Sequence, residues 1–188
     1  REVNVARLCY GLAILWTNGG RTSDVFIETK HEAVKYHNKV IHHRDIRFIR
    51  ESQDSLQLTE VPRVESTGHQ FDKRERKEEL HGSGIPFFGV RTPREFILDS
   101  GLWLDFIYEL DDNLDINDPI FHWDDDPKRL ILAEDYRDFV RGTLHLLGCD
   151  ISPENIRYIS TRRGLAQDAT DAGFRDNDLQ LLCNWSDP

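Results

Sequence analysis

The chain has 188 residues, of which 38% are hydrophobic and 31% are charged, and its formal net charge is −10. This composition is that of a folded globular protein, and no apolar run approaches the ~18 to 20 residues that cross a bilayer. The length suits a single domain spanning residues 1–188, so we expect one domain and no membrane partner.

The negative charge is concentrated in the second half of the chain. Residues 1–100 contain 16 basic and 15 acidic residues, whereas residues 101–188 contain 8 and 19. Much of the excess lies in residues 111–126, which we interpret as a solvated acidic loop. A surface for a basic partner is the alternative.

The cysteines indicate a reducing compartment. Cys9, Cys149 and Cys183 are far apart, and each lies in an apolar segment. Such spacing favours buried thiols over a disulfide framework or a zinc site. We therefore expect an intracellular protein without a bound metal.

The first half of the chain predicts a helix followed by a small sheet. Apolar residues recur at helical spacing over residues 3–17, and the glycines at 19–20 end this helix. A second short helix is expected to begin near residues 25–27. Partial alternation predicts strands at 43–49, 55–61 and 85–90, which would form an antiparallel sheet. The charged segment 68–82 is expected to be a mobile hairpin tip.

The second half predicts helices. One begins near residues 92–93 and reaches residue 110, with a possible break at 100–101, and another covers residues 133–147 with Gly148 as its C-cap. An Ala-rich helix near the end of the chain stops at a glycine, and a further short helix follows. The order of helix, sheet and helices predicts an α+β fold.

Three segments carry residues suited to holding a phosphate. Arg21 follows the glycine turn, with Asp24 three positions later. Arg162 and Arg163 stand at the start of the Ala-rich helix, and Trp185 follows about twenty residues further on. The planar guanidinium donates two parallel hydrogen bonds to phosphate oxygens, a geometry that Lys reproduces poorly.

This order of segments resembles the catalytic domain of the tyrosine recombinases, the phage-integrase family. The specific part is the second segment, Arg162 with Gly-Leu-Ala-Gln-Asp-Ala-Thr-Asp-Ala-Gly over residues 164–173. The resemblance implies a mainly helical catalytic-domain fold with a small antiparallel three-stranded sheet. It also implies binding of duplex DNA by a homo-oligomer, without metal or small-molecule cofactor. The location would be the nucleus in a eukaryote, or the cytoplasm or nucleoid in a bacterium or phage.

The resemblance also assigns roles to individual residues. Arg21, Arg162 and Trp185 would act at the scissile phosphate, together with a hairpin lysine, for which we favour Lys73. The further DNA-binding candidates are Arg163, Arg63 and Lys77. In this family a tyrosine forms a covalent bond to the DNA 3′-phosphate, and that bond is later reversed by a 5′-hydroxyl.

Two departures from the family pattern bear on activity. The residue three positions before Arg162 is Ile159, where the family has a histidine that assists proton transfer. The nucleophilic tyrosine is expected about nine residues after Trp185, beyond Pro188, and none of the five tyrosines of the chain lies at that place. We therefore expect the nucleophile to belong to a segment beyond this chain.

Alternative interpretations remain open on the sequence. The chain could be a non-catalytic relative that binds DNA or acts as a scaffold, or a protein-interaction domain in which Arg162 and Arg163 pair with the acidic segment. Trp185 could be a core residue, and Lys73 a solvated loop lysine. His42 and His43 would lie on opposite faces of a strand, so a shared metal ion is not expected.

Overall fold

The computed structural model describes residues 2–31, 40–50, 63, 66–72, 86–90, 96–124, 126–149, 152–157 and 160–182. Its α-helices are α1 (Glu2–Thr17), α2 (Thr22–Val25), α4 (Ser100–Leu110), α5 (Ala133–Leu146), α6 (Ser160–Asp171) and α7 (Asp176–Leu182). The short 3-10 helices are η2 (His43–Asp45), η4 (Phe96–Leu98) and η5 (Pro153–Asn155). The strands are β1 (Arg47–Ile49), β2 (Gly68–Asp72), β3 (Pro86–Val90), β4 (His122–Trp123) and β5 (Asp126–Leu130). This is the predicted α+β class.

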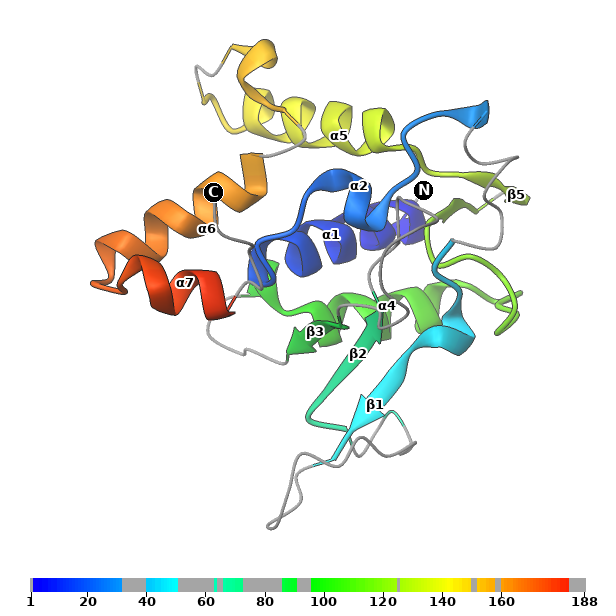
Figure 1. The fold of residues 1–188 in the computed structure, drawn as a ribbon. Helices are drawn as coiled ribbons and strands as arrows, with labels where there is room; N and C mark the ends of the chain where they lie inside the picture. The colour runs from blue at the N-terminus through cyan, green and yellow to red at the C-terminus, as the bar shows by residue number, and fades with distance from the viewer. Residues whose placement is uncertain are drawn as a thin grey trace.

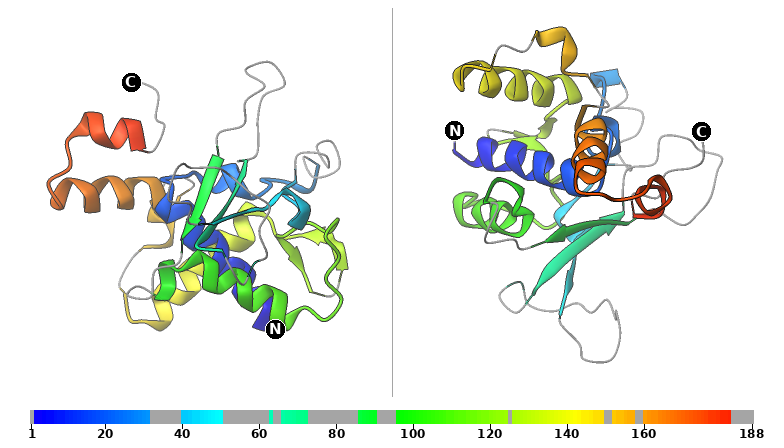
Figure 2. Two further views of the ribbon diagram at one scale, coloured as in Figure 1. Left: turned by 90° about the horizontal axis from the view of Figure 1, so that it is seen from below. Right: turned by 90° about the vertical axis from the view of Figure 1, so that its left-hand side faces the viewer.

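Helix α1 runs through the middle of the molecule, with α5 on one side and α4 on the other (Figures 1 and 2). Tyr10, Ala13 and Ile14 have no exposed surface, and even Arg7 is fully buried. Val5, which the spacing placed on the buried face, is 45% exposed. A helix covered from several sides is buried around most of its circumference, so the spacing of its apolar residues does not identify one inner face.

The three-stranded sheet is antiparallel, as predicted, and its strand order is β1-β2-β3. The strand predicted at 55–61 lies outside the described residues. The observed middle strand is Gly68–Asp72, which we had assigned to the hairpin tip. His69, Gln70 and Phe71 are all buried in it, because both faces of the strand are covered. Such a strand shows no alternation of apolar and polar residues.

The segment around the paired histidines is a 3-10 turn, so the predicted strand at 43–49 is wrong in its first half. The carboxylate of Asp45 accepts a hydrogen bond of 2.8 Å from the backbone N–H of His42, which holds the turn. His42 and His43 are both buried and do not lie on opposite faces of a strand. Strand β1 begins only at Arg47.

The acidic segment is partly built into the core, which corrects the prediction of a solvated loop. Ile120 and Phe121 are buried, and β4 pairs antiparallel with β5 to form a hairpin. The side chain of Asn4 donates to Asp124 and accepts from its backbone N–H, at 3.1 and 2.9 Å. These bonds fix the hairpin to the start of α1.

The helices of the second half agree with the sequence pattern, except for one start. Helix α4 begins at Ser100, where we expected a break, because the Asp99 side chain caps it by accepting from the backbone N–H of Leu102 at 2.8 Å. Gly148 and Gly173 end α5 and α6 with φ of 73° and 86°, in the left-handed region. Among the described helices, none has the length and apolar character needed to cross a membrane.

Candidate functional site

The turn after α1 depends on its two glycines. Gly19 has φ of 59°, and the backbone N–H of Gly20 donates to the carbonyl of Leu15 at 2.9 Å, which closes the end of the helix. A Cβ atom on Gly20 would lie 2.9 Å from the side chains of both Leu15 and Phe87. The chain therefore passes closely between α1 and β3 immediately before Arg21.

Arg21 leaves this turn in an extended conformation and precedes α2. Its backbone N–H donates to the carboxylate of Asp24 at 2.7 Å, so the acidic residue three positions on holds the first turn of α2. The Arg21 side chain is exposed. The carboxylate thus fixes the backbone from which this guanidinium projects into solvent.

Helix α6 packs directly on the same turn, although it lies far away in the sequence. The Thr161 hydroxyl donates to the carbonyl of Gly20 at 2.9 Å across 141 residues, and this bond is buried. A Cβ atom on Gly164 would lie 2.5 Å from the indole of Trp16, so the glycine permits the close approach of α6 to α1. Gly20 and Thr161 immediately precede Arg21 and Arg162. Each arginine is therefore the next residue after one partner of the hydrogen bond between Thr161 and Gly20.

The sheet joins this junction through β3. The side-chain amide of Asn18 donates to the carbonyl of Phe88 at 2.9 Å and accepts from its backbone N–H at 2.8 Å. A paired bond of this kind fixes both the position and the direction of the strand. We call the contacts of Asn18, Gly20 and Thr161 the arginine junction, since they hold the two arginine segments and the sheet together.

The structure describes four of the seven predicted site residues. Arg162 is half-buried in the first turn of α6, and Arg163 beside it is exposed. Arg63 pairs with Asp105 at 3.2 Å, and its guanidinium lies 4.9 Å from the centre of the Tyr108 ring. These contacts engage Arg63 with α4, and it is not one of the residues of the arginine junction.

The remaining predicted site residues are Lys73, Lys77 and Trp185, and they lie outside the described residues, as does Ile159. Lys73 follows Asp72 directly in the sequence, and Asp72 pairs with Pro86 at one end of the β2–β3 ladder. Two residues further along β3 is Phe88, which is bound to the arginine junction.

A second polar cluster, which the sequence analysis missed, lies around Arg7 of α1. Arg7 is fully buried and pairs with Asp111, the C-cap of α4. The same nitrogen contacts Nε2 of His122 in β4 at 2.9 Å, and Nδ1 of His122 lies 2.7 Å from the carbonyl of Trp123. Donation from the arginine requires a lone pair on Nε2, which indicates a neutral His122 that donates from Nδ1.

Burial governs the protonation of this cluster. It lowers the pKa of Arg7, although Asp111 opposes the shift. Burial, followed by the charge of Arg7, lowers the pKa of His43 to about 4 and also lowers the pKa of His122. His43 packs against Tyr108 with ring centres 5.4 Å apart, and both of its ring nitrogens are buried without a hydrogen-bond partner among the described contacts. Both histidines are therefore neutral at pH 7.

The Arg7 cluster joins α1, α4, η2 and β4, and we assign it a structural role. Its side chains are buried, whereas a site for a large anion needs exposed donors. One signal was available in the sequence: Arg7 stands three and seven residues before Tyr10 and Ile14, on the same helical row as these fully buried side chains. Among the described residues, no three His, Cys, Asp or Glu side chains are grouped so that they could hold a metal ion.

Comparisons of this chain with protein-family models, with curated proteins and with solved structures gave no match.

Proposed function

We propose that this chain is a tyrosine-recombinase-like catalytic domain that binds a phosphate of duplex DNA between Arg21 and Arg162. The supporting observation is the hydrogen bond from Thr161 to the Gly20 carbonyl, since it couples the two segments that carry these arginines. The half-buried position of Arg162 and the exposure of Arg21 suit a site at which a phosphate is approached from two sides.

The chemistry of strand cleavage explains why two arginines would be required. A tyrosine oxygen attacks phosphorus, the bond to the 5′-oxygen breaks, and negative charge develops on the non-bridging oxygens. Two preorganised guanidinium groups stabilise this charge, and loss of one such donor typically raises a barrier by ~3 to 4 kcal/mol. In this proposal Lys73 protonates the departing 5′-oxygen, and a tyrosine C-terminal to this chain is the nucleophile.

A second candidate is a DNA-binding module of the same ancestry without cleavage activity. Ile159 favours it, because an aliphatic side chain cannot transfer the proton that the family histidine handles. Both candidates require duplex DNA as the partner, and both place the arginine junction against its backbone. They differ in whether a covalent protein–DNA bond forms.

Binding of a labelled DNA duplex, followed by fluorescence anisotropy, tests the requirement shared by both candidates. We expect the affinity to fall steeply between about 50 and 200 mM salt, because phosphate contacts release counterions. Arg162→Ala should weaken binding about 10- to 100-fold, as expected for charged hydrogen bonds worth ~1.5 to 3 kcal/mol. It should also reduce the salt slope by about 1.

Arg44→Ala is a matched control, because it removes the same charge from a side chain that bonds Asn117 within the acidic segment. Affinity that does not depend on salt, or equal losses in both variants, would contradict the proposal. In the full-length protein, a suicide duplex distinguishes the two candidates. A covalent complex that Arg162→Ala abolishes supports the enzyme, and its absence supports the binding module.

A further inference from the structure

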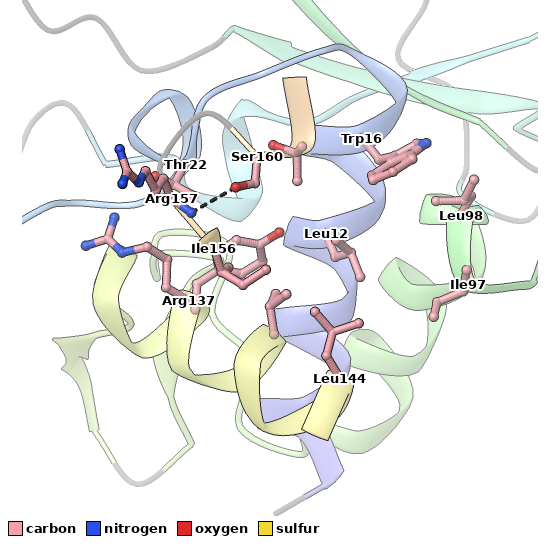
Figure 3. A pocket seen from close by; sticks show the side chains of 13 residues that line it. Leu12, Trp16, Thr22, Ile97, Leu98, Arg137, Leu144, Ile156, Arg157 and Ser160 are labelled. Carbon is pink, nitrogen blue, oxygen red and sulfur yellow. Dashed lines mark hydrogen bonds between the residues drawn. The ribbon is translucent and has the colours of Figure 1, made fainter. Parts of the chain in front are cut away.

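A cavity of about 330 Å³ lies between α1, α5 and the start of α6 (Figure 3). Leu12 and Trp16 of α1 line one wall, and Val140 and Leu144 of α5 line another. Neither Arg21 nor Arg162 is among its lining residues, although their neighbours Thr22 and Thr161 are. The cavity is therefore distinct from the arginine junction and shares a wall with it.

The lining is largely apolar, and two arginines, Arg137 and Arg157, belong to it. Arg137 lines the cavity but already pairs with Glu28 at 3.5 Å and with Glu134. The guanidinium groups of Arg137 and Arg157 lie on the side opposite Trp16 (Figure 3). An apolar surface of this kind favours an uncharged ligand, because burying an unpaired charge in it would cost far more than the apolar contact returns.

Two buried hydroxyl groups give a second indication that the cavity has an occupant. The hydroxyl oxygens of Thr22 and Tyr136 have no hydrogen-bond partner within the described structure, and both residues line the cavity. Buried hydroxyl groups in folded proteins are nearly always paired, so an unpaired one requires an explanation. A side-chain rotation that turns either hydroxyl to the cavity surface would let it pair with a hydroxyl or carbonyl group of a ligand.

The size of the cavity indicates a small molecule as its ligand. Small-molecule sites enclose about 300 to 1,000 Å³, whereas a stable protein partner covers about 800 Å² on each side. The cavity falls in the first class. We propose that it binds a small uncharged molecule with an aromatic or short acyl body and at most one polar group.

Two fluorescent probes with the same aromatic rings test this assignment. N-phenyl-1-naphthylamine is uncharged, and 8-anilinonaphthalene-1-sulfonate is its anionic counterpart. The uncharged probe should bind the folded chain saturably with a stoichiometry of one, and more tightly than the anion. Tighter binding of the sulfonate would overturn the assignment of an uncharged ligand, and no binding of the uncharged probe would overturn the site.

Substitutions in α5 locate the binding. Leu144→Trp fills the cavity and should weaken binding of the uncharged probe by about tenfold or more. Leu146→Trp makes the same change two residues away, where the side chain is 87% exposed, and should leave binding unchanged. Val140→Phe is a second filling variant for use if Leu144→Trp does not fold, as judged by circular dichroism. Wild-type affinity in the folded filling variants would contradict the proposal.

Discussion

The buried histidine of η2 should make the protein sensitive to acid. His43 is only 4% exposed, and burial together with Arg7 lowers its pKa from the usual 6.5 to about 4. His122 and His42 also oppose its protonation, and Asp111 favours it. The unfolded chain therefore takes up this proton at a higher pH than the folded chain. The contribution of neutral His43 to the free energy of unfolding is complete above about pH 6.5 and is lost as the pH falls towards 4.

The size of the effect follows from the shift in pKa. One pKa unit corresponds to about 1.36 kcal/mol, so this single group should lower the free energy of unfolding by about 2 kcal/mol at pH 5 and about 3 kcal/mol at pH 4. These are substantial fractions of the ~5 to 15 kcal/mol that stabilises a typical domain. His43→Phe keeps an aromatic ring against Tyr108 and removes the titrating nitrogens.

Urea unfolding of the wild type and of His43→Phe at a series of pH values isolates this contribution. Titrating groups remote from His43 behave alike in both proteins, so their effects cancel in the difference, whereas groups coupled to His43, such as Asp111 and His122, contribute to it. At pH 7 the free energy of unfolding of the variant should equal or exceed that of the wild type. At pH 4 the difference between the two free energies should have grown by about 3 kcal/mol in favour of the variant. A difference that stays constant with pH would refute the assignment of a buried, neutral His43.

Two further predictions concern packing and buried charge. Gly164→Ala should destabilise the protein by about 1 to 3 kcal/mol in urea unfolding, because its Cβ would lie 2.5 Å from the Trp16 indole. In Gly142→Ala in α5 the added Cβ would have no atom within 4 Å, so this variant should instead be stabilised by up to about 1 kcal/mol. If Gly142→Ala were less stable than Gly164→Ala, the packing of α6 on α1 would be contradicted. Asp111→Asn leaves the buried guanidinium of Arg7 without its counter-charge and should cost about 3 to 5 kcal/mol, so a loss below about 1 kcal/mol would show that the cluster is solvated.

Helix ends were the most predictable features of the fold, because local chemistry sets them. Glycines at 19, 148 and 173 adopt the left-handed backbone that ends a helix, and each was recognisable from its position after a segment expected to be helical. The same reasoning located α5 almost to the residue. It misread the start of α4, because an aspartate cap and a break produce the same pattern at Ser100.

The partners of buried polar residues were not predictable from the sequence. His69 in β2 is buried because its Nε2 meets the hydroxyl of Tyr10 at 2.8 Å, and Arg7 is buried because Asp111 and His122 lie opposite it. Each partner lies more than fifty residues away, so no local pattern reveals the pair. His69 consequently fell within a segment expected to be a hairpin tip.

The sequence indicated candidate residue types for a phosphate site, but not the contacts between the segments that carry them. The order of Arg21 and Arg162 along the chain suggested a shared ligand, and the contact between Gly20 and Thr161 joins the segments that carry them. Nothing in the sequence indicated that Asn18 would also tie β3 to this junction. The bond depends on the pairing of β3 within the sheet, which is a long-range property.

A double-mutant cycle on duplex DNA tests the proposal that Arg21 and Arg162 bind one phosphate. Affinities would be measured at low salt for the wild type, Arg21→Ala, Arg162→Ala and the double variant. If both side chains hold the same phosphate, the losses of binding free energy in the two single variants should not add up to the loss in the double variant. The coupling free energy should be about 0.5 to 3 kcal/mol. Losses that add to within about 0.5 kcal/mol, or single variants that bind like the wild type, would contradict the claim.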